Sequence, residues 1–423
     1  MSLHHEGLQP CLSKHLKFIS SIRTMSLLFS GGRIFDGLGN VLEDHGVLVE
    51  KDRITRVAPN SEFKGFIGPR VDTSSGTLLP GLIDCHVHLV YCAETDPGTK
   101  VMKLKPGEIV MRALANAQAS LRGGITTLRD LGGREFLEFA VRDACNSGAQ
   151  FGPTIRAAGQ IICMTGGHGN QHGRIADGED EVLKAAREQI HAGSDVIKLM
   201  ATGGVMTQGV DPEDAHYTEK ELRVGVQEGH RFHRTCASHA QGSAGILNAV
   251  RAGIDSIEHG IFMTDECVEE MLTNGTFLVP TLSALLNILN HQDEGIPDYI
   301  IEKSLRITER HRESVLMFHR AGGKIAMGTD AGTPFNRHGE NRNELKYMVE
   351  LGIPEKDALV SANANAAELL ELPERGRIQE GAFADLLFVE GDPLTDINCV
   401  CDMSRHRVIL KNGIRVSEPV QED

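Results

Sequence analysis

Basic residues are in short supply in this 423-residue sequence: 43 Lys and Arg stand against 58 Asp and Glu, which gives a formal net charge of -15. Nucleic acids and anionic membranes both repel a surface of that charge, so nonspecific binding to either is disfavoured. We therefore expect no nucleic-acid partner and no membrane partner. The length allows one large domain plus a smaller one. The expected binding partner is a small molecule.

Two further absences bear on location. The nine cysteines are scattered between Cys11 and Cys401 without a CxxC pair, and an odd number cannot be fully paired within one chain, which predicts reduced thiols. No hydrophobic run near the N-terminus is long enough for export or for membrane spanning, because Lys17 and Arg23 interrupt it. Both absences favour a cytoplasmic protein. Residues 1–26 are then expected to form a poorly ordered N-terminal extension.

The two ends of the sequence share a pattern of short strands and turns. Near the N-terminus, "LLFSGGRIFDG" and "GVLVEKDRITRVAP" alternate apolar residues with Gly-rich turns. Near the C-terminus, "GAFADLLFVE" and "RHRVILKNGIRV" do the same, and the second contains an Asn-Gly hairpin signal. We expect a small β-sandwich domain assembled from residues 27–79 and 366–423, with a larger domain, residues 80–365, inserted between its two parts.

Between these flanks, short apolar runs alternate with helical patterns, which is typical of parallel βα units. Eight runs are predicted strands: "GLIDCHVHL", "GITTLRDLG", "TIRAAG", "DVIKLMATGG", "RTCASHA", "DSIEHG", "TFLVPTL" and "GKIAMGTDAG". The predicted helices cover residues 108–122, 135–148, 179–192, 218–234, 242–252, 263–274 and 298–321. Eight alternating units predict an α/β fold of the (β/α)8 TIM-barrel type. A doubly wound sheet is the alternative, but no GxGxxG motif opens a first helix.

Residues of the metal-binding type end four of the eight predicted strands. His86 and His88 are two residues apart in "DCHVHL", so on a strand they point to the same face. His239, His259 and Asp330 end three other strands. Strand ends gather at one face of this fold, so the five side chains are expected to converge. Imidazole nitrogens and a carboxylate suit zinc or a similar divalent ion. The alternative interpretation is that the histidines are structural residues held by hydrogen bonds.

Lys198 lies inside the apolar run "DVIKLMATGG", where an unpartnered lysine is rare. Burial disfavours the ammonium form and lowers its pKa, so the neutral amine becomes available for reaction with carbon dioxide. The product, a carbamate, has two oxygens that can bridge two cations. A lysine that reaches solvent or pairs with a carboxylate such as Asp130 is the alternative. Beside four histidines and an aspartate, we favour the bridging carbamate.

An ordered set of motifs resembles the amidohydrolase superfamily over roughly residues 27–415: "DCHVHL", "VIKLMATGG", "CASHA", "SIEHG", "GTDAGTP" and "GRIQEGAFADLLFVEGDP". The resemblance implies a binuclear metal centre, usually of zinc. It also implies a role for each ligand: the first ion is held by His86, His88 and Asp330, the second by His239 and His259, and carboxylated Lys198 bridges both.

Such a centre predicts hydrolysis of an amide or a related C–N bond of a small substrate. A hydroxide that bridges two cations is a nucleophile at neutral pH, because metals lower the pKa of bound water from about 16 toward about 7. Asp330 is expected to take its proton and to pass it to the leaving nitrogen. The cofactors are then two divalent ions, of which zinc is expected before manganese or cobalt, and carbon dioxide as the carbamate on Lys198.

Within the superfamily the sequence resembles the imidazolonepropionase-like group, which includes dipeptidases acting on Xaa-Pro or on Xaa-Arg and Xaa-Lys; "MTGGHGNQ", "KLMATGGV" and "HYTEKEL" carry this resemblance. In those dipeptidases the positions of His168 and Tyr217 are candidates for binding the free carboxylate of the substrate. For Tyr217, packing next to the N-cap Thr218 is the alternative. We expect an Xaa-Pro dipeptidase, with N-acyl-proline as a related substrate. The acidic loop "GVDPEDAHY" would instead favour a basic leaving residue.

Three other functions remain as alternatives. An imidazolonepropionase-like lactam hydrolase is expected to use one metal and to lack the lysine of the fourth strand. A deaminase of the same fold is expected to have a Glu in an HxxE motif after the fifth strand, which "CASHAQGSAG" lacks. A catalytically silent binding homologue is expected to have lost ligands, whereas all six are present. The oligomeric state stays open, with a homo-oligomer among the possibilities.

Overall fold

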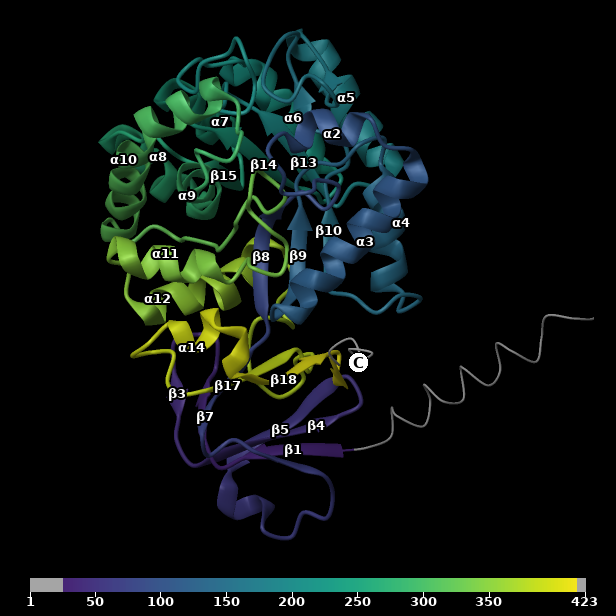
Figure 1. Cartoon of the computed structure of the whole chain (residues 1–423), viewed down its shortest axis with the longest axis vertical. Helices are drawn as coiled ribbons and strands as arrows, with labels where there is room; N and C mark the ends of the chain where they lie inside the picture. Colours follow the sequence, from purple (N-terminus) through teal and green to yellow (C-terminus); the bar gives the residue numbers. More distant parts are fainter. Residues whose placement is uncertain (1–25, 417–423) are drawn as a thin grey trace, which may run out of the picture.

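Two units make up the protein in the computed structural model, which describes residues 26–416. Figure 1 shows a ring of strands wrapped by helices above a smaller unit, in which purple N-terminal and yellow C-terminal strands lie side by side. The predicted N-terminal extension lies outside the described residues, except for Ser26, at which β1 begins. The eight cysteines of the described part are free thiols. No helix within residues 26–416 is long and apolar enough to cross a membrane.

The ring is the predicted barrel. Seven of its strands are β8 (Leu82–Val87), β9 (Ile125–Asp130), β10 (Thr154–Ala157), β13 (Val196–Met200), β14 (Thr235–Ala240), β15 (Ser256–His259) and β16 (Phe277–Val279). Neighbours pair in parallel along β8-β9-β10 and along β13-β14-β15-β16. A hydrogen bond from Asp195 N to Ala157 O joins these two runs. The eighth predicted strand is a short segment whose parallel bridges, Ile325 to Leu278 and Ala331 to Val87, close the ring. The (β/α)8 fold is confirmed.

Helices cover the outside of the ring. Seven match the predicted stretches: α3 (Pro106–Arg122), α4 (Leu137–Asn146), α5 (Gly178–Ala192), α6 (Glu219–Arg231), α7 (Ser243–Ala252), α8 (Asp265–Asn274) and α10 (Asp298–Arg320). The N-cap predicted for α6 is present, since Thr218 Oγ1 accepts a hydrogen bond from Glu221 N. The sequence did not predict α2 (Pro97–Met102), α9 (Leu282–Asn290), α11 (Asn343–Leu351), α12 (Glu355–Val360) and α14 (Asn398–Cys401), whereas α13 (Ala366–Leu369) lies within "SANANAAELL", which predicts a helix that leads back to the small domain. Of these, α9 starts three residues after β16 and so lies beside the barrel mouth.

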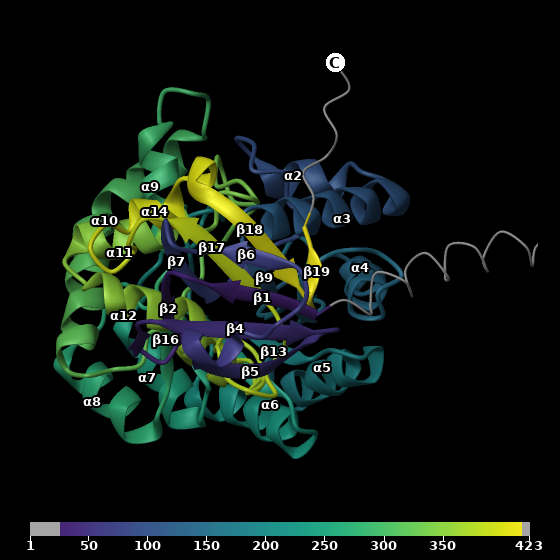
Figure 2. The same cartoon turned by 90° about the horizontal axis from the view of Figure 1, so that it is seen from below.

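The smaller unit consists of two sheets that draw strands from both ends of the chain. One sheet has the order β5 (Arg53–Pro59), β4 (His45–Glu50), β1 (Ser26–Ser30), β6 (Arg70–Asp72). The other has the order β19 (Ile414–Arg415), β18 (His406–Lys411), β17 (Leu386–Glu390), β7 (Gly76–Pro80), β2 (Arg33–Phe35), β3 (Val41–Leu42). Phe29, Ile54, Leu386 and Leu410 belong to the buried apolar cluster of this unit. Figure 2 shows β1 and β4 lying across β17 and β18, as in a sandwich.

The connection between the units sets the direction of the barrel. β7 ends at Pro80, and Gly81 leads directly into β8, which leaves the sandwich and enters the ring (Figure 1). A Cβ at Gly81 would lie 2.2 Å from Thr126 Cγ2, so a larger residue does not fit this crossing. The carboxyl ends of the parallel strands therefore face away from the sandwich. Residues of this fold that carry chemistry are expected at that face.

The domain boundaries stay predictions, with one change at residue 366. Ala366 and Leu370, which the sequence assigns to the small domain, pack in one apolar cluster with Ile83 of β8 and Phe277 of β16. The reason is that α13 continues the helical layer around the barrel before the chain returns to the sandwich. We therefore propose that the barrel domain extends past Leu370.

Candidate metal centre

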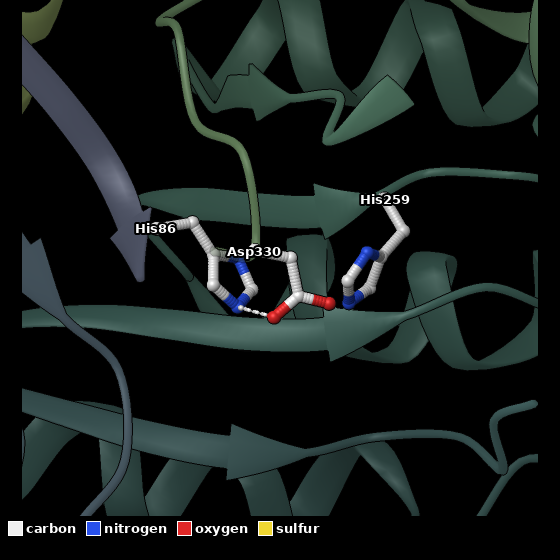
Figure 3. Close-up of side chains that lie close together, drawn as sticks. All are labelled: His86, His259 and Asp330. Carbon is white, nitrogen blue, oxygen red and sulfur yellow. Dashed lines mark ion pairs between the residues drawn. The ribbon is translucent and has the colours of Figure 1, made fainter. Parts of the chain in front are cut away.

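The predicted ligand residues come together at the carboxyl ends of the barrel strands. His86 on β8, His259 at the end of β15 and Asp330 in the eighth segment offer ligand atoms that all lie within 4.8 Å of one another. Figure 3 shows the Asp330 carboxylate between the two rings. Asp330 Oδ1 lies 3.4 Å from His86 Nε2 and 3.2 Å from His88 Nε2. The His239 ring extends the cluster, with its centroid 4.5 Å from that of His259.

Each of the four histidines has one ring nitrogen engaged by a fixed neighbour, which leaves the other nitrogen for the centre of the cluster. These contacts are His86 Nδ1 with Glu258 Oε2 at 2.8 Å, His88 Nδ1 with Gly132 O at 2.9 Å, His239 Nε2 with Gly203 O at 2.9 Å and His259 Nδ1 with Thr281 Oγ1 at 2.7 Å. Metal-binding histidines in proteins are held in the same way, because the outer hydrogen bond fixes the ring and its tautomer. The arrangement therefore suits metal binding.

The protonation state of the four histidines also suits metal binding. Burial holds the pKa values of His86, His239 and His259 below that of a free imidazole. Burial alone would lower the pKa of His88 as well, but its hydrogen bond with Asp330 raises it. Neutral imidazole is the form that binds a metal ion. Three of the four rings are thus in the binding form before an ion arrives.

Lys198 has the setting that a modified lysine requires. It is 2 % exposed, on β13, and its Nζ has no hydrogen-bond partner within the described part of the chain. Burial lowers the pKa of the amine to about 8. Asp130, the alternative partner, instead accepts hydrogen bonds from Leu89 N and Gly132 N. A buried amine without a partner is costly, so this position fits a carbamate between two cations and does not fit a structural ion pair.

The backbone at the cluster is strained. His259, Thr281 and Asp330 have φ angles of 73°, 55° and 61°, in the left-handed region that residues other than glycine rarely adopt. Such conformations cost on the order of 1–3 kcal/mol each and persist only where the surrounding structure holds them. Asp330 N is held by a 2.7 Å hydrogen bond to His86 O. Strain of this kind is concentrated at functional sites, and here it falls on two ligand-type residues and the partner of one of them.

A cavity opens beside the cluster, and all six predicted ligand residues line it. The wall has a polar part, formed by Tyr91, His168, Gln171, His172, Thr207 and Gln241, and an apolar part, formed by Val205, Met206, Ile261, Leu285 and Ile288. The predicted substrate-binding residue His168 is therefore in the wall. Its Nδ1 lies 2.8 Å from Thr207 Oγ1, and its ring centroid lies 4.5 Å from that of His239.

Tyr217 does not line this cavity. Its side chain is 2 % exposed, and its hydroxyl donates a 2.7 Å hydrogen bond to Ala176 O. Burial raises the pKa of the hydroxyl. A buried tyrosine hydroxyl needs a partner, and the backbone carbonyl supplies it. The structure therefore does not support the predicted contact of Tyr217 with a substrate carboxylate; it places Tyr217 in the packing role next to Thr218.

The acidic loop, residues 211–214, also lies outside the cavity wall. Asp211 pairs with Arg306 at 2.7 Å instead. Among the described residues that line the cavity, the carboxylates are Asp96 and Asp330, and Asp96 accepts the N–H of a residue in the first turn of α2. A basic side chain in the cavity would therefore meet one carboxylate apart from the one in the metal cluster, that of Asp96, of which one oxygen already accepts a backbone hydrogen bond.

Sequence reasoning missed the residues that orient the cluster and part of the cavity wall. Glu258 and Thr281 engage ring nitrogens of the cluster. Tyr91 and His172 share a 2.8 Å hydrogen bond and line the cavity. The sequence pointed to two of these residues only by their position: Glu258 directly precedes His259, and Tyr91 follows the His-x-His motif. Strand patterns do not say which side chains meet across a barrel, so position alone was not sufficient.

Known proteins resemble this chain over most of its length. The model of the amidohydrolase family matches residues 77–414. An ochratoxinase of Aspergillus niger is 32 % identical over 415 residues, which cover 90 % of this chain and 85 % of the relative.

Solved structures of two similar proteins agree in fold. A Xaa-Pro dipeptidase with bound methionine has a TM-score of 0.84 and 31 % identity, with 93 % of this chain and 100 % of that chain covered. A prolidase in complex with N-methylphosphonate-L-proline has a TM-score of 0.85 and 30 % identity, with the same coverage. Amidohydrolases generally use metal ions, in keeping with the cluster described above. The chain therefore belongs to the amidohydrolase family and is a hydrolase that acts on C–N bonds.

Proposed function

We propose that this protein is a binuclear, zinc-dependent dipeptidase of the cytoplasm that releases proline from Xaa-Pro dipeptides or from N-acyl-prolines. The observation that carries the proposal is the unpartnered Lys198 amine inside a cluster of four histidines and one aspartate. His86, His88 and Asp330 would hold one ion, His239 and His259 the other, and carboxylated Lys198 both. When bound, the two cations lower the pKa of a water molecule toward 7 and withdraw charge from the scissile carbonyl.

Asp330 is the group that moves the proton. Its carboxylate lies at the centre of the cluster and also lines the cavity, so it can reach both the attacking water and the substrate. It takes a proton from the water during attack and donates it to the leaving nitrogen when the C–N bond breaks. Its strained backbone, tied to His86 O, keeps the carboxylate in this position.

The cavity wall supports proline over a basic leaving residue. Neutral donors such as His168, Gln171 and Gln241 are available for the free carboxylate of a dipeptide. Val205, Leu285 and the other apolar residues suit an uncharged ring or alkyl group. A lysine or arginine side chain would lose its hydration beside these apolar residues, and outside the metal cluster the described cavity wall offers it one carboxylate, that of Asp96.

A second candidate substrate is ochratoxin. It is supported by the Aspergillus niger relative, whose name gives that activity, and by the apolar part of the cavity wall. Hydrolysis of either candidate substrate would break an amide bond at the same centre, so the two substrates differ only in the group that would occupy the cavity.

The test is the release of free amino acid from a panel of substrates by protein reconstituted with zinc and bicarbonate. The panel contains matched Xaa-Pro, Xaa-Arg, Xaa-Lys and Xaa-Leu dipeptides, an N-acyl-proline and ochratoxin. We expect release from Xaa-Pro at a kcat/KM at least about tenfold above that for Xaa-Arg, a difference of about 1.4 kcal/mol. Faster release from Xaa-Arg or Xaa-Lys would overturn the proline assignment. No release from any amide by protein that holds zinc would overturn the dipeptidase proposal as a whole.

A further inference from the structure

A buried ion pair lies behind the candidate metal centre, and we propose that it positions His86 for metal binding. Arg129 of β9 and Glu258 of β15 are 1 % and 0 % exposed, and Arg129 Nη2 donates to Glu258 Oε1 at 2.9 Å. The other carboxylate oxygen, Oε2, accepts from His86 Nδ1 at 2.8 Å. Three strands of the barrel are joined by these two contacts. The inference rests on the proposed metal centre but assigns a positioning role to two residues, Arg129 and Glu258, that take no part in the proposed reaction.

Every polar side-chain atom of Arg129 and Glu258 has a hydrogen-bond partner. Glu258 Oε1 also accepts from Ser256 Oγ at 2.6 Å, and both Nη atoms of Arg129 lie 3.2 Å from Ser256 Oγ. Arg129 Nε donates to Cys85 O at 2.6 Å, one residue before His86. A buried charge pair is tolerated when its hydrogen bonds are satisfied in this way. The carboxylate is therefore held in one orientation.

That orientation selects the tautomer of His86. A carboxylate that accepts hydrogen bonds from Arg129 and Ser256 with one oxygen can accept a hydrogen bond from the N–H of His86 Nδ1 with the other. The hydrogen on Nδ1 leaves the lone pair on Nε2, which is the atom that faces Asp330. An imidazole can bind a metal ion only through a nitrogen without hydrogen. Glu258 does not line the cavity, so its role is positioning and not catalysis.

Glu258→Gln is the sharpest test because an amide has one acceptor end and one donor end. If its oxygen faces Arg129, its NH2 group donates to His86 Nδ1 and moves the ring hydrogen to Nε2. If its oxygen faces His86, its NH2 group meets the guanidinium, and two donors oppose each other. Neither orientation satisfies both partners, although the shape of the side chain is nearly unchanged.

Zinc affinity is measured on the holoenzyme by competition with a chromogenic chelator. We expect Glu258→Gln to weaken one of the two zinc sites by about 10- to 100-fold, the usual effect of losing an outer partner of a metal-bound histidine, and to change the other by less. At limiting zinc, kcat should fall while KM stays within about twofold, since Glu258 does not touch the cavity. Excess zinc should restore most of the kcat.

Two further variants separate positioning from general destabilisation. Asp385→Asn removes a carboxylate of the sandwich that is equally buried and pairs with Arg375 and Lys411, so it is expected to change stability and leave both zinc affinities unchanged. Ser256→Ala keeps the carboxylate and removes one of the hydrogen bonds to it, together with the two hydrogen bonds from Arg129 to Ser256 Oγ, so it should weaken the same zinc site by a smaller factor.

Wild-type zinc affinity in Glu258→Gln would overturn the inference, and so would an equal loss in Asp385→Asn. If Glu258→Gln does not fold, Ser256→Ala decides: an unchanged zinc affinity in that variant then counts against the inference. If the wild-type protein itself binds no zinc, the metal centre and this inference fall together. If it binds zinc but hydrolyses no amide, only the proposed function falls.

Discussion

Two lysines are buried to the same degree in this protein, one in each unit. Lys198 on β13 and Lys411 on β18 are both 2 % exposed, and burial lowers the pKa of both to about 8. Lys411 Nζ donates to Asp385 Oδ2 and to Thr154 Oγ1, each at 2.8 Å, and so ties the sandwich to β10 of the barrel. Lys198 Nζ has no hydrogen-bond partner within the described residues.

The comparison shows that burial and pKa do not by themselves distinguish a functional lysine from a structural one. Burial disfavours the charged form of both amines, but Lys411 gains hydrogen bonds to a carboxylate and a hydroxyl in exchange for water. Lys198 stands instead among histidines that have their own partners and line the same cavity. The cost of its burial is recovered only when something is added to the amine or bound beside it, which is the reason that we assign the carbamate to Lys198.

The largest effect is expected from Lys198→Ala. Without the bridging group both zinc ions should bind much more weakly, and kcat should fall by about 10,000-fold, because polarisation by the metals contributes several kcal/mol. Zinc per chain is measured by atomic emission after gel filtration, and turnover with the best dipeptide of the panel. Two zinc ions retained per chain would contradict the role given to Lys198.

The carboxylates of the two regions, Asp330 and Asp385, should likewise differ in whether their loss affects turnover or stability. Asp330→Asn should lower kcat by about 1,000-fold, the usual contribution of a proton-transfer group, with little change in thermal stability. Asp385→Asn, the matched variant in the sandwich, should lower the melting temperature and keep the kcat of the folded fraction. Stopped assays and thermal scans on both proteins check this. An active Asp330→Asn enzyme would remove Asp330 from proton transfer.

Lys411→Met should affect stability alone. It removes one partner of a buried pair, although Arg375 still pairs with Asp385, so we expect the free energy of unfolding to fall by about 3 kcal/mol. Urea denaturation followed by circular dichroism gives the change. Zinc content should remain that of the wild type. Loss of zinc from this variant would contradict the purely structural role that its contacts give to Lys411.

The smallest effect is a pH dependence of stability. Lys411 has a pKa of about 8 in the folded protein against 10.5 for a free lysine, because burial disfavours its charged form. Between these pH values the unfolded chain binds more protons than the folded chain, so the contribution of Lys411 to stability rises with pH. Relative to Lys411→Met, the wild type should gain about 1 kcal/mol per pH unit between pH 8 and 10. A difference that falls across this range would contradict the assignment.

Much of the fold followed from local patterns. Seven strands of the barrel, the short eighth segment and seven of the helices lie where apolar runs and helical periodicity place them, because each element buries its own face against the ring. The five ligand-type residues at strand ends meet as expected, since parallel strands of one barrel end at one face. The sandwich followed from strand patterns at both ends of the chain, except for residues 366–370, which pack on the barrel.

The substrate side of the site was less predictable. His168 is in the cavity wall, but Tyr217 and the acidic loop are not, although all three lie in loops that follow barrel strands. Loop residues have no periodic pattern that says which way a side chain points. The apolar wall contributed by α9 was missed for a related reason: this short helix follows β16 directly and was not separated from the strand pattern.

The sequence by itself determined which residues could bind a metal and that they would share one end of a barrel, because spacing on strands and strand direction are local properties. Only the tertiary structure decided which nitrogen of each histidine is free, that Arg129 and Glu258 stand behind His86, and that Lys411 has a hydrogen-bonded carboxylate, whereas Lys198 has no hydrogen-bond partner among the described residues. These are contacts between residues far apart in the chain. Their energies depend on distance and burial, which no local pattern encodes.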